Sequence, residues 1–388
     1  MNNLSFWEQQ SFFHRYDVVV VGSGIVGLSA ALSLKENDPG LQIAVVERGV
    51  LPFGASTRNA GFACFGSMSE LLDDLSARPS EEVFALVERR WQGLQKLRQR
   101  LGDAQLHYQP FGGYEIFRAE EVAIFEKCMT RMPEFNRIIG EITGEKEVYV
   151  PADGKIKEFG FHGVSHIILN LAEGQIHTGS MMKSLIDLVR QSGIAIFNGL
   201  TIERLEEQTD RVALHTGPGW HFSAGKVLVA TNGFARQLLP DLQLFPGRNQ
   251  VLITKPLRDL PFRGSFHYDR GYFYFRNVDE PERTGWSRIL LGGGRNLAME
   301  EEKTAEFGTT ELIRSALISL LKTVILPSHP VEIETWWSGI MGLGDEKKPV
   351  VKMVSPRIGV AVRLGGMGVA LGSLVGEEAA EMLIAANS

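Results

Sequence analysis

The sequence predicts an α/β protein with a parallel-sheet domain and a second, α+β domain built on a mostly antiparallel sheet. An unbroken β-branched run at residues 18–21 is followed at once by a glycine-rich turn and then by apolar residues at helical spacing. Residues 250–291 instead hold short apolar runs separated by polar turns, which is typical of antiparallel strands. The length of 388 residues exceeds the roughly 250–300 that one core usually supports.

The first element is a βαβ unit at the start of the chain. Residues 18–21 show no polar alternation, so we expect a parallel strand that is buried on both faces. A second β run at residues 43–46 ends in Glu47. Between them lie Gly22-Ser23-Gly24-Ile25-Val26-Gly27 and a helical pattern. This order predicts a Rossmann-like domain.

Later segments are assigned by the same periodicities. Residues 81–101 place their apolar side chains on one stripe and predict an amphipathic helix. Residues 108–161 are expected to supply strands of the second domain, because their apolar runs are short and interrupted. Further expected elements are a helix at 180–190, strands at 194–197 and 227–230, and a terminal helix that ends near Ala386.

These segments alternate along the chain, so both predicted domains are discontinuous. The first domain is expected to comprise residues 1–103, 166–245 and 335–388. The second is expected to comprise residues 104–165 and 246–334. The chain would then cross between the domains four times.

Composition excludes several classes of protein. The net charge is −6 without any block of lysine or arginine, so nucleic acid is not an expected partner. The two cysteines cannot form a disulfide framework, which fits the reducing cytoplasm, where we expect the protein to be located. The longest apolar stretch, residues 18–34, is interrupted by glycine and serine and predicts no membrane span. No histidine or cysteine cluster has metal-ligand spacing, so no metal is expected.

The glycine-rich turn has the spacing of a dinucleotide-binding site. Bare backbone between a strand and a helix lets a pyrophosphate approach N–H groups at the positive helix end. Glu47 lies 20 residues beyond Gly27, where a carboxylate accepts hydrogen bonds from ribose hydroxyls. The motif alone leaves NAD and FAD both open, and close helix packing is the purely structural alternative.

Two further segments favour the larger ligand. The loop Ser56-Thr57-Arg58-Asn59-Ala60-Gly61 carries hydroxyls and a guanidinium that suit diphosphate and ribityl groups, although an exposed loop is the alternative. The turn Gly365-Gly366-Met367-Gly368 precedes a helix and would bring backbone donors to a planar ring, although helix packing is the alternative. Together with the first turn, these segments suit a ligand of the size of FAD.

At these segments, and at Thr231-Asn232-Gly233, the sequence resembles the D-amino-acid-oxidase-like FAD-dependent oxidoreductases. This group includes glycine oxidase, sarcosine oxidase and γ-glutamylputrescine oxidoreductase. The resemblance extends from about Asp17 to Leu383 and is specific for FAD and the fold rather than for a substrate. It implies that the first domain binds FAD and that the antiparallel sheet of the second domain covers the flavin.

The resemblance also implies roles for individual residues. Gly22, Gly24 and Gly27 would meet the pyrophosphate, Glu47 and Arg48 the adenosine ribose, Thr57 to Gly61 the diphosphate and flavin, Ile202 the adenine, and Gly366 to Gly368 the flavin pyrimidine edge. Neither cysteine lies in the C-terminal half, where sarcosine oxidases make their covalent flavin link, so noncovalent FAD is expected.

Candidate substrate-orienting residues alternate along one predicted strand. Two tyrosines and an arginine are interleaved with phenylalanines, so a strand would present both phenols and the guanidinium on one face. A carboxylate would bind there by a charge-assisted pair, whereas the structural alternative is a half-exposed face with the arginine in solvent. These candidates are Tyr272, Tyr274 and Arg276, with Arg295 and Arg363 as rival anchors.

The sequence departs from better-known relatives at two places. Residues 289–292 lack the lysine that promotes the oxygen reaction in some of these oxidases, and residues 336–342 lack an arginine carried by glycine-oxidase-like proteins. These departures favour an electron acceptor other than oxygen and a substrate other than glycine, and they identify neither. No residue stands out as a general base.

We therefore expect an enzyme that oxidises the C–N bond of an amino acid or small amine by hydride transfer to flavin N5, giving an imine that hydrolyses. The alternatives are an FAD-dependent 2-hydroxy-acid dehydrogenase, an NAD-linked dehydrogenase, and an FAD-binding subunit that needs a partner for turnover.

Overall fold

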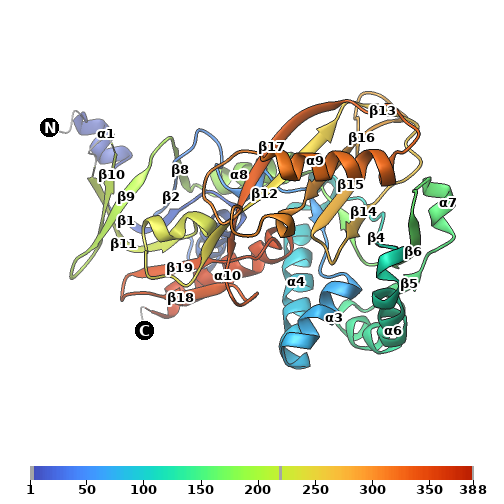
Figure 1. Cartoon of the computed structure of the whole chain (residues 1–388). Helices are drawn as coiled ribbons and strands as arrows, with labels where there is room; N and C mark the ends of the chain where they lie inside the picture. The colour runs from blue at the N-terminus through green and yellow to red at the C-terminus, as the bar shows by residue number, and fades with distance from the viewer. Residues whose placement is uncertain (1–3, 218–220, 387–388) are drawn as a thin grey trace.

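The computed structural model describes residues 4–217 and 221–386. Two main sheets lie side by side, the first toward the chain termini and the second toward the opposite end of the molecule (Figure 1). Segments far apart in the sequence build each sheet, because strands from both ends of the chain meet in the first one.

The first sheet has eight strands in the order β18-β19-β11-β1-β2-β8, with β10 beside β11 and β9 beside β10. The pairs from β19 to β8 are all parallel, which confirms the predicted parallel sheet. The strands are β1 (Tyr16–Val21), β2 (Ile43–Glu47), β8 (Ala195–Asn198), β9 (Ile202–Glu207), β10 (Val212–Thr216), β11 (His221–Val229), β18 (Val350–Met353) and β19 (Ile358–Val362).

Strand β1 is buried on both faces, as its β-branched run predicts. Val18 and Val20 pack into one cluster, and Val19 and Val21 into another on the opposite face. The first cluster is supplied by helices α2 (Ile25–Asn37), α4 (Ser80–Leu101), α8 (Thr178–Gln191) and α10 (Gly368–Ala385). Helices on one face of a parallel sheet hold the glycine-rich turn where β1 ends.

Helices α2 and α10 approach each other closely because glycines face the contact. A Cβ at Gly372 would lie 2.5 Å from Ile25 Cγ2, and one at Gly376 would lie 2.6 Å from Ser29 Cβ. Contacts advance by four residues on both helices in the same direction, so the helices run parallel. Their N-termini therefore lie at the same end of the pair.

We predict that Gly376→Ala lowers the free energy of unfolding by about 1–3 kcal/mol, because an added methyl overpacks this contact. A Cβ atom added at Gly376 would lie only 2.6–2.8 Å from its three nearest heavy atoms. Thermal unfolding measures the effect. Gly154→Ala is the control, since a Cβ at Gly154 meets nothing within 4 Å. Equal melting temperatures for the two variants would contradict the packing argument.

The second sheet has nine strands and is almost entirely antiparallel, which confirms the predicted α+β character. Its order is β17-β12-β16-β15-β14-β4-β6-β5, with β13 beside β16, and β4 and β14 form its parallel pair. The strands are β4 (Gly113–Arg118), β5 (Tyr149–Pro151), β6 (Val164–Asn170), β12 (Phe245–Thr254), β13 (Leu257–Arg258), β14 (Ser265–Tyr268), β15 (Phe273–Asp279), β16 (Trp286–Gly293) and β17 (Ile333–Leu343).

One face of the second sheet is covered by helix α9 (Glu311–Leu320) and the turn η5 (Leu321–Ile325). Leu252, Phe275 and Leu291 pack there against apolar residues of that segment. The shorter elements are α1 (Phe6–Ser11), α3 (Met68–Ala77), α5 (Asp103–Leu106), α7 (Lys155–Phe159), η1 (Ala55–Thr57), η2 (Ala119–Glu121), η3 (Asn232–Gln237), η4 (Arg295–Leu297) and the pair β3 (Phe62–Ala63) and β7 (Gly174–Gln175).

Within residues 108–161, the expectation of strands alone is wrong. The structure has helix α6 (Val122–Thr143) there, between strands β4 and β5. Cys128, Met132, Phe135 and Ile139 are its buried residues, at spacings of three and four. Pro133 lies inside the helix and disguises this period, because proline removes a backbone donor and is typical of helix ends.

The domain boundaries stay predictions. Strands β6 and β17 continue the second sheet past two of the expected boundaries, to Asn170 and Leu343. In the part of the chain that the structure describes, no helix combines the length and apolar character needed to cross a membrane. The cytoplasmic location stays a prediction.

Candidate active site

The glycine-rich turn joins β1 to α2 and requires bare backbone. Gly22 has φ 108°, and a Cβ there would lie 2.9 Å from the Ala230 carbonyl oxygen. A Cβ at Gly27 would overlap the Gly22 carbonyl. Gly24 is the N-cap of α2 and forms no side-chain cap, so Ile25 and Val26 open the helix next to uncovered backbone. The turn thus presents the positive end of α2 as an anion site.

Glu47 lies at the carboxyl end of β2, beside this turn. Its Oε2 accepts hydrogen bonds from Ser23 N (3.1 Å) and Ser23 Oγ (2.9 Å), and its Oε1 accepts one from Gly49 N (3.0 Å). The residue is only 5 % exposed. These contacts hold the carboxylate where the motif requires an acceptor for ribose hydroxyls.

The guanidinium of Arg48 contacts two aromatic rings. It lies 3.9 Å from the Phe234 centroid and 4.4 Å from the Phe53 centroid, and Nη1 donates to Gln237 at 3.2 Å. Burial lowers its pKa. Ile202 begins β9, two residues after Leu200, whose N–H donates to the Glu47 carbonyl. Arg48 and Ile202, which are predicted to contact the adenosine part of FAD, therefore both lie near Glu47.

The loop at residues 54–61 closes over the start of α2. Ser56 Oγ accepts a hydrogen bond from Ile25 N at 3.0 Å. Asn59 fixes the loop internally, since Nδ2 donates to Ser56 O (2.7 Å) and Oδ1 accepts from Gly61 N (2.9 Å). Thr57 Oγ1 donates to Pro52 O at 2.9 Å. Ala60 lies between these anchors, half-buried.

Arg58 points toward the second sheet. Its guanidinium lies 4.3 Å from the Phe307 centroid, and Nη1 donates to Ser338 O at 3.2 Å. In the reverse direction, Trp337 Nε1 donates to the Arg58 carbonyl at 3.0 Å. The loop is therefore bound to strand β17 of the second sheet.

The C-terminal turn lies beside the first. Gly365 and Gly366 have φ 58° and 84°, which favour glycine, Met367 is the N-cap of α10, and Gly368 begins that helix. Because α2 and α10 run parallel in contact, two positive helix ends lie next to each other. Asn232, between Thr231 and Gly233, connects to this turn by accepting a hydrogen bond from Arg363 N at 3.0 Å.

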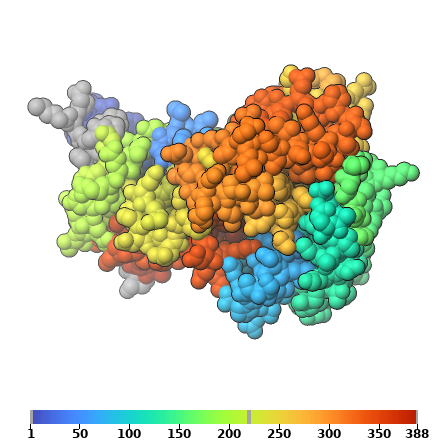
Figure 2. Space-filling model, viewed as in Figure 1, coloured from blue at the N-terminus to red at the C-terminus, as the bar shows by residue number. Residues whose placement is uncertain are grey.

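These segments fit an extended, partly anionic ligand. The two helix N-termini, the loop at residues 54–61 and Glu47 come together at one edge of the first sheet. Thr231 lies there beside Gly22, and its Oγ1 is buried without a partner among the described residues, so it offers a polar group for hydrogen bonding. Figure 2 shows a recess in the middle of the molecular surface, bordered by orange, red and blue segments.

Strand β15 carries two of the predicted substrate-orienting residues, Tyr274 and Arg276, on one face, whereas Tyr272 precedes the strand and packs against the apolar cluster of Phe273 and Phe275. Tyr274 Oη accepts a hydrogen bond from Asn249 Nδ2 at 3.2 Å, and burial raises the pKa of this phenol. Tyr272 is half-buried. Arg276 is buried, and its Nη1 donates to Gly61 O (2.8 Å) and Ile176 O (2.7 Å). Burial lowers its pKa to about 10.

The rival anchors differ in what they contact. Arg363 donates to Lys348 O (2.8 Å) and Gln243 O (3.3 Å) and pairs with Glu346. Arg295 follows the glycine run that ends β16, and its Nη1 lies 3.3 Å from Met299 Sδ. Its pKa is lowered by burial. Of the three arginines, Arg276 and Arg363 thus donate to backbone carbonyls.

The fold and the converging turns define a two-domain dinucleotide-binding oxidoreductase. The chain belongs to the family described as FAD dependent oxidoreductase, which matches residues 17–382. This membership confirms FAD as the cofactor and sets aside the NAD-linked alternative. The chain is therefore an FAD-dependent oxidoreductase.

Several known proteins are similar over most of the chain. γ-Glutamylputrescine oxidoreductase of Escherichia coli (strain K12) is 25 % identical over 380 residues, covering 95 % of this chain and 83 % of the relative. A probable oxidoreductase of Rhizobium meliloti (strain 1021) is 24 % identical over 387 residues, with the same coverage.

Solved structures confirm the fold. Glycine oxidase from Geobacillus kaustophilus superposes with a TM-score of 0.76 at 19 % identity, covering 96 % of this chain and 95 % of that one. Iminodiacetate oxidase from Chelativorans sp. BNC1 gives 0.75 at 17 % identity, covering 95 % of both chains. L-proline dehydrogenase from P. horikoshii gives 0.73 at 16 % identity, covering 95 % of this chain and 93 % of that one.

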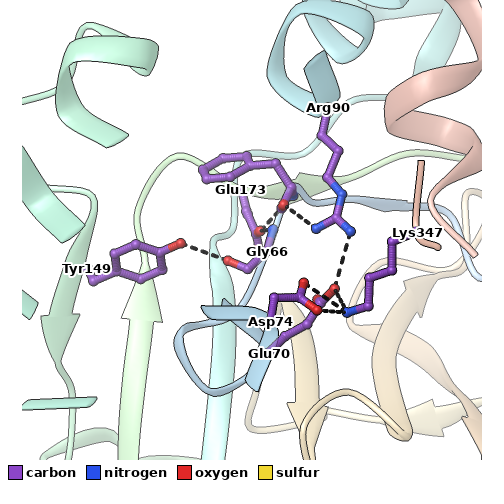
Figure 3. Close-up of polar contacts among 8 residues, drawn as sticks. Gly66, Glu70, Asp74, Arg90, Tyr149, Glu173 and Lys347 are labelled. Atoms are coloured by element: carbon purple, nitrogen blue, oxygen red, sulfur yellow. Dashed lines mark hydrogen bonds and ion pairs between the residues drawn. The ribbon is translucent and has the colours of Figure 1, made fainter. Parts of the chain in front are cut away.

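Beyond the cofactor loop in the chain lies a partly buried ion-pair cluster that sequence reasoning missed. Arg90 of α4 and Lys347 of the loop that joins β17 to β18 converge on Glu70 of α3 (Figure 3). Lys347 also pairs with Asp74 at 2.7 Å. Although burial acts the other way, Arg90 and Lys347 lower the pKa of Glu70 to about 2. The sequence does contain one signal for this cluster: Arg90 is a charged residue within the apolar stripe of α4, where a buried charge needs a partner.

Two further carboxyl groups, those of Glu115 and Glu173, are buried against residues 65–69. Glu173 Oε1 accepts from Phe65 N (2.8 Å) and Gly66 N (3.1 Å), and Glu115 accepts from the Ser69 N–H and hydroxyl. Burial raises the pKa of Glu115 to about 7 and that of Glu173 to about 8. Both carboxyl groups thus hold protons at pH values where exposed glutamates have lost them.

We predict that these two groups make the protein less stable as the pH rises from about 5 to about 8. The unfolded chain loses both protons near the ordinary pKa of 4.5, whereas the folded protein retains them up to about 7 and 8. Folding therefore takes up protons in this window, so the free energy of unfolding falls by about 1.4 kcal/mol per pH unit for each proton retained. Denaturant titrations across this range should give a flatter dependence for Glu173→Gln; an unchanged slope would contradict the assignment.

Proposed function

We propose that this enzyme oxidises the C–N bond of an amino acid or small amine with noncovalent FAD, taking hydride from the carbon next to nitrogen and giving an imine that hydrolyses in water. The observation that carries the proposal is the chemistry named by its relatives. γ-Glutamylputrescine, glycine, L-proline and iminodiacetate all contain an amine nitrogen bonded to a carbon that bears hydrogen.

The roles of individual residues follow from their contacts. FAD supplies a two-electron acceptor at N5. Tyr274 keeps its proton because burial raises its pKa, so its hydroxyl donates to the substrate while Asn249 fixes its position. Arg276 positions Gly61 of the cofactor loop rather than holding the substrate. Trp337 and Arg58 close the loop against β17, which excludes water from one side of the site.

Arg295 is the anchor that we propose for a substrate carboxylate, because its guanidinium is not engaged by the backbone carbonyls that hold Arg276 and Arg363. Tyr272 is close enough to Arg295 to influence its pKa, so the two residues share one region. The remaining cofactor contacts are those that the motif predicts for Gly22 to Gly27, Glu47, Arg48 and residues 56–61.

We predict that Arg295→Gln raises KM for an amino-acid substrate by about 10- to 100-fold, the equivalent of a lost charged hydrogen bond, while kcat changes less. Arg276→Gln should instead lower FAD retention, since it frees the Gly61 loop. Steady-state kinetics and the ratio of flavin to protein absorbance measure the two effects. A KM increase confined to Arg276→Gln would move the anchor there.

The test of the proposal is anaerobic mixing of the holoenzyme with panels of amines, amino acids and 2-hydroxy acids while flavin absorbance is recorded. Bleaching by an amine or amino acid supports C–N oxidation. Bleaching confined to 2-hydroxy acids supports the hydroxy-acid dehydrogenase alternative instead. Bleaching that requires an added partner protein supports the FAD-binding subunit.

A further inference from the structure

A small cavity lies against the face of the second sheet that carries Tyr274. Its volume is about 10 Å³, close to the smallest that holds one water molecule. Ser67, Glu115, Tyr149, Asn170, Glu173 and His267 contribute its polar lining. Most of these residues lie far apart in the sequence.

Three lining atoms have unmet hydrogen-bonding capacity. Ser67 Oγ, Asn170 Nδ2 and His267 Nε2 are buried and have no partner within the described ranges. Asn170 is only 3 % exposed. Glu173 Oε2 sits directly above Gly113, where a Cβ would overlap it, so glycine at this position makes room for the carboxyl group. A water molecule needs two to four polar partners, and this cavity supplies them.

The sheet register connects the cavity to the substrate side. Tyr274 of β15 pairs with His267 of β14, and His267 pairs with Glu115 of β4. Directly paired residues project to the same face with Cβ atoms about 5 Å apart. The Phe62 ring contacts both Tyr274 and His267 edge-on, with centroids 5.6 and 5.2 Å apart. Tyr274, His267 and Glu115 therefore form one row of side chains across three neighbouring strands, and Phe62 lies beside this row.

We propose that Glu115 and Glu173, with one water molecule in the cavity that they line, form a proton-holding site that exchanges protons with the substrate side through His267. The pKa values of about 7 and 8 agree with this role, because each carboxyl group then gains and loses a proton near neutrality. Burial lowers the pKa of His267 to about 4, so its ring is neutral, with one nitrogen donor and one acceptor.

The exchange that we propose rests on the proposed amine oxidation. A substrate ammonium group must lose a proton before hydride leaves the neighbouring carbon. One N–H bond breaks at the substrate and one O–H bond forms at Glu115 or Glu173, while His267 accepts a proton at one ring nitrogen and releases one from the other. No electrons are transferred in this step. The other titratable groups packed around the pair are Cys64, Glu70, Arg90, Tyr108, Cys128 and Tyr149.

Infrared difference spectra of the holoenzyme between about pH 6 and about pH 9 test the site without any substrate, since this range brackets both pKa values. We expect C=O bands of protonated carboxylic acids that disappear as the pH rises, with one band missing in Glu115→Gln and another in Glu173→Gln. Ser67→Ala should shift a band without removing it. Glu206→Gln, which changes an exposed carboxylate of the first sheet, should leave the bands unchanged. Absence of titrating bands, or their persistence in both glutamine variants, overturns the proposal.

The role of His267 is tested separately by His267→Phe, which preserves an aromatic ring beside Phe62. We expect anaerobic bleaching by an active amine to slow at least tenfold below about pH 8, while photoreduction of the flavin without amine keeps its rate. An unchanged amine rate overturns exchange through His267. If no amine bleaches the flavin of the unmodified enzyme, the proposed function fails, and the infrared result still decides whether the carboxyl pair holds protons.

Discussion

Glu47→Ala protein is expected to purify with much less bound FAD than the unmodified enzyme. The substitution removes the acceptor at the ribose position and also leaves the N–H groups of Ser23 and Gly49 without their buried partner. Each buried donor left unpaired costs about 1–3 kcal/mol, so the glycine-rich turn loses its shape as well as its ligand contact. We expect FAD affinity to fall at least tenfold, equivalent to about 1.4 kcal/mol.

Flavin absorbance relative to protein absorbance measures this loss, and titration of the apoprotein with FAD gives the affinity. Glu203→Ala is the matched control, because Glu203 is an exposed carboxylate in strand β9 of the same sheet. Glu47→Gln should retain part of the affinity, since its amide oxygen still accepts one hydrogen bond. Normal FAD content in Glu47→Ala would contradict the assigned role of this carboxylate.

Lys347→Met is expected to produce the second large effect, a loss of both stability and flavin retention. Lys347 pairs with Glu70 and Asp74, which follow the cofactor loop in sequence, and its own carbonyl lies beside Gly365 of the C-terminal turn. Breaking a fully buried pair costs about 3–5 kcal/mol. The Lys347 side chain is 37 % exposed, so we expect a smaller cost of about 1–3 kcal/mol.

The neighbouring lysine provides the control. Lys348 pairs with Glu82, and both side chains are nearly half exposed, so Lys348→Met should change stability by less than about 1 kcal/mol. Chemical denaturation gives the stability, and the rate of FAD release into excess buffer gives retention. If Lys347→Met releases FAD no faster than Lys348→Met, the ion pair stabilises the fold without positioning the cofactor segments.

The first domain was predictable because its signals are local. The buried run of β1, the spacing of Gly22, Gly24 and Gly27, and the carboxylate at the end of β2 all lie within about 30 residues. Parallel strands and a phosphate-binding turn require this local order, so one short stretch of sequence specifies both. The family resemblance then extended the prediction to the cofactor.

The ion-pair cluster was not predictable in the same way. Glu70, Arg90 and Lys347 come from three separate segments, and their contacts exist only once the tertiary structure has formed. Helix α6 was missed for a different reason, because Pro133 interrupts its helical pattern in the sequence. There, the packing of the buried face of α6 outweighs the local signal.

The substrate side was predictable only in part. Alternation predicts Tyr274 and Arg276 on one face of a strand, and both lie in β15, whereas Tyr272 precedes that strand. Alternation cannot show that the Arg276 guanidinium reaches carbonyls of Gly61 and Ile176, which lie 215 and 100 residues away in the chain. The choice among Arg276, Arg295 and Arg363 therefore rests on their contacts in the folded protein.

The parallel contact of α2 with α10 determines when the cofactor can be acquired. Helix α2 leaves the ribosome early, whereas α10 begins only at Gly368, shortly after strand β19. Domains begin to fold during synthesis from the N-terminal end. A nascent chain therefore holds an incomplete nucleotide site until α10 has been synthesised and has packed against α2, so we expect FAD to bind only after this step and removal of α10 to release the cofactor.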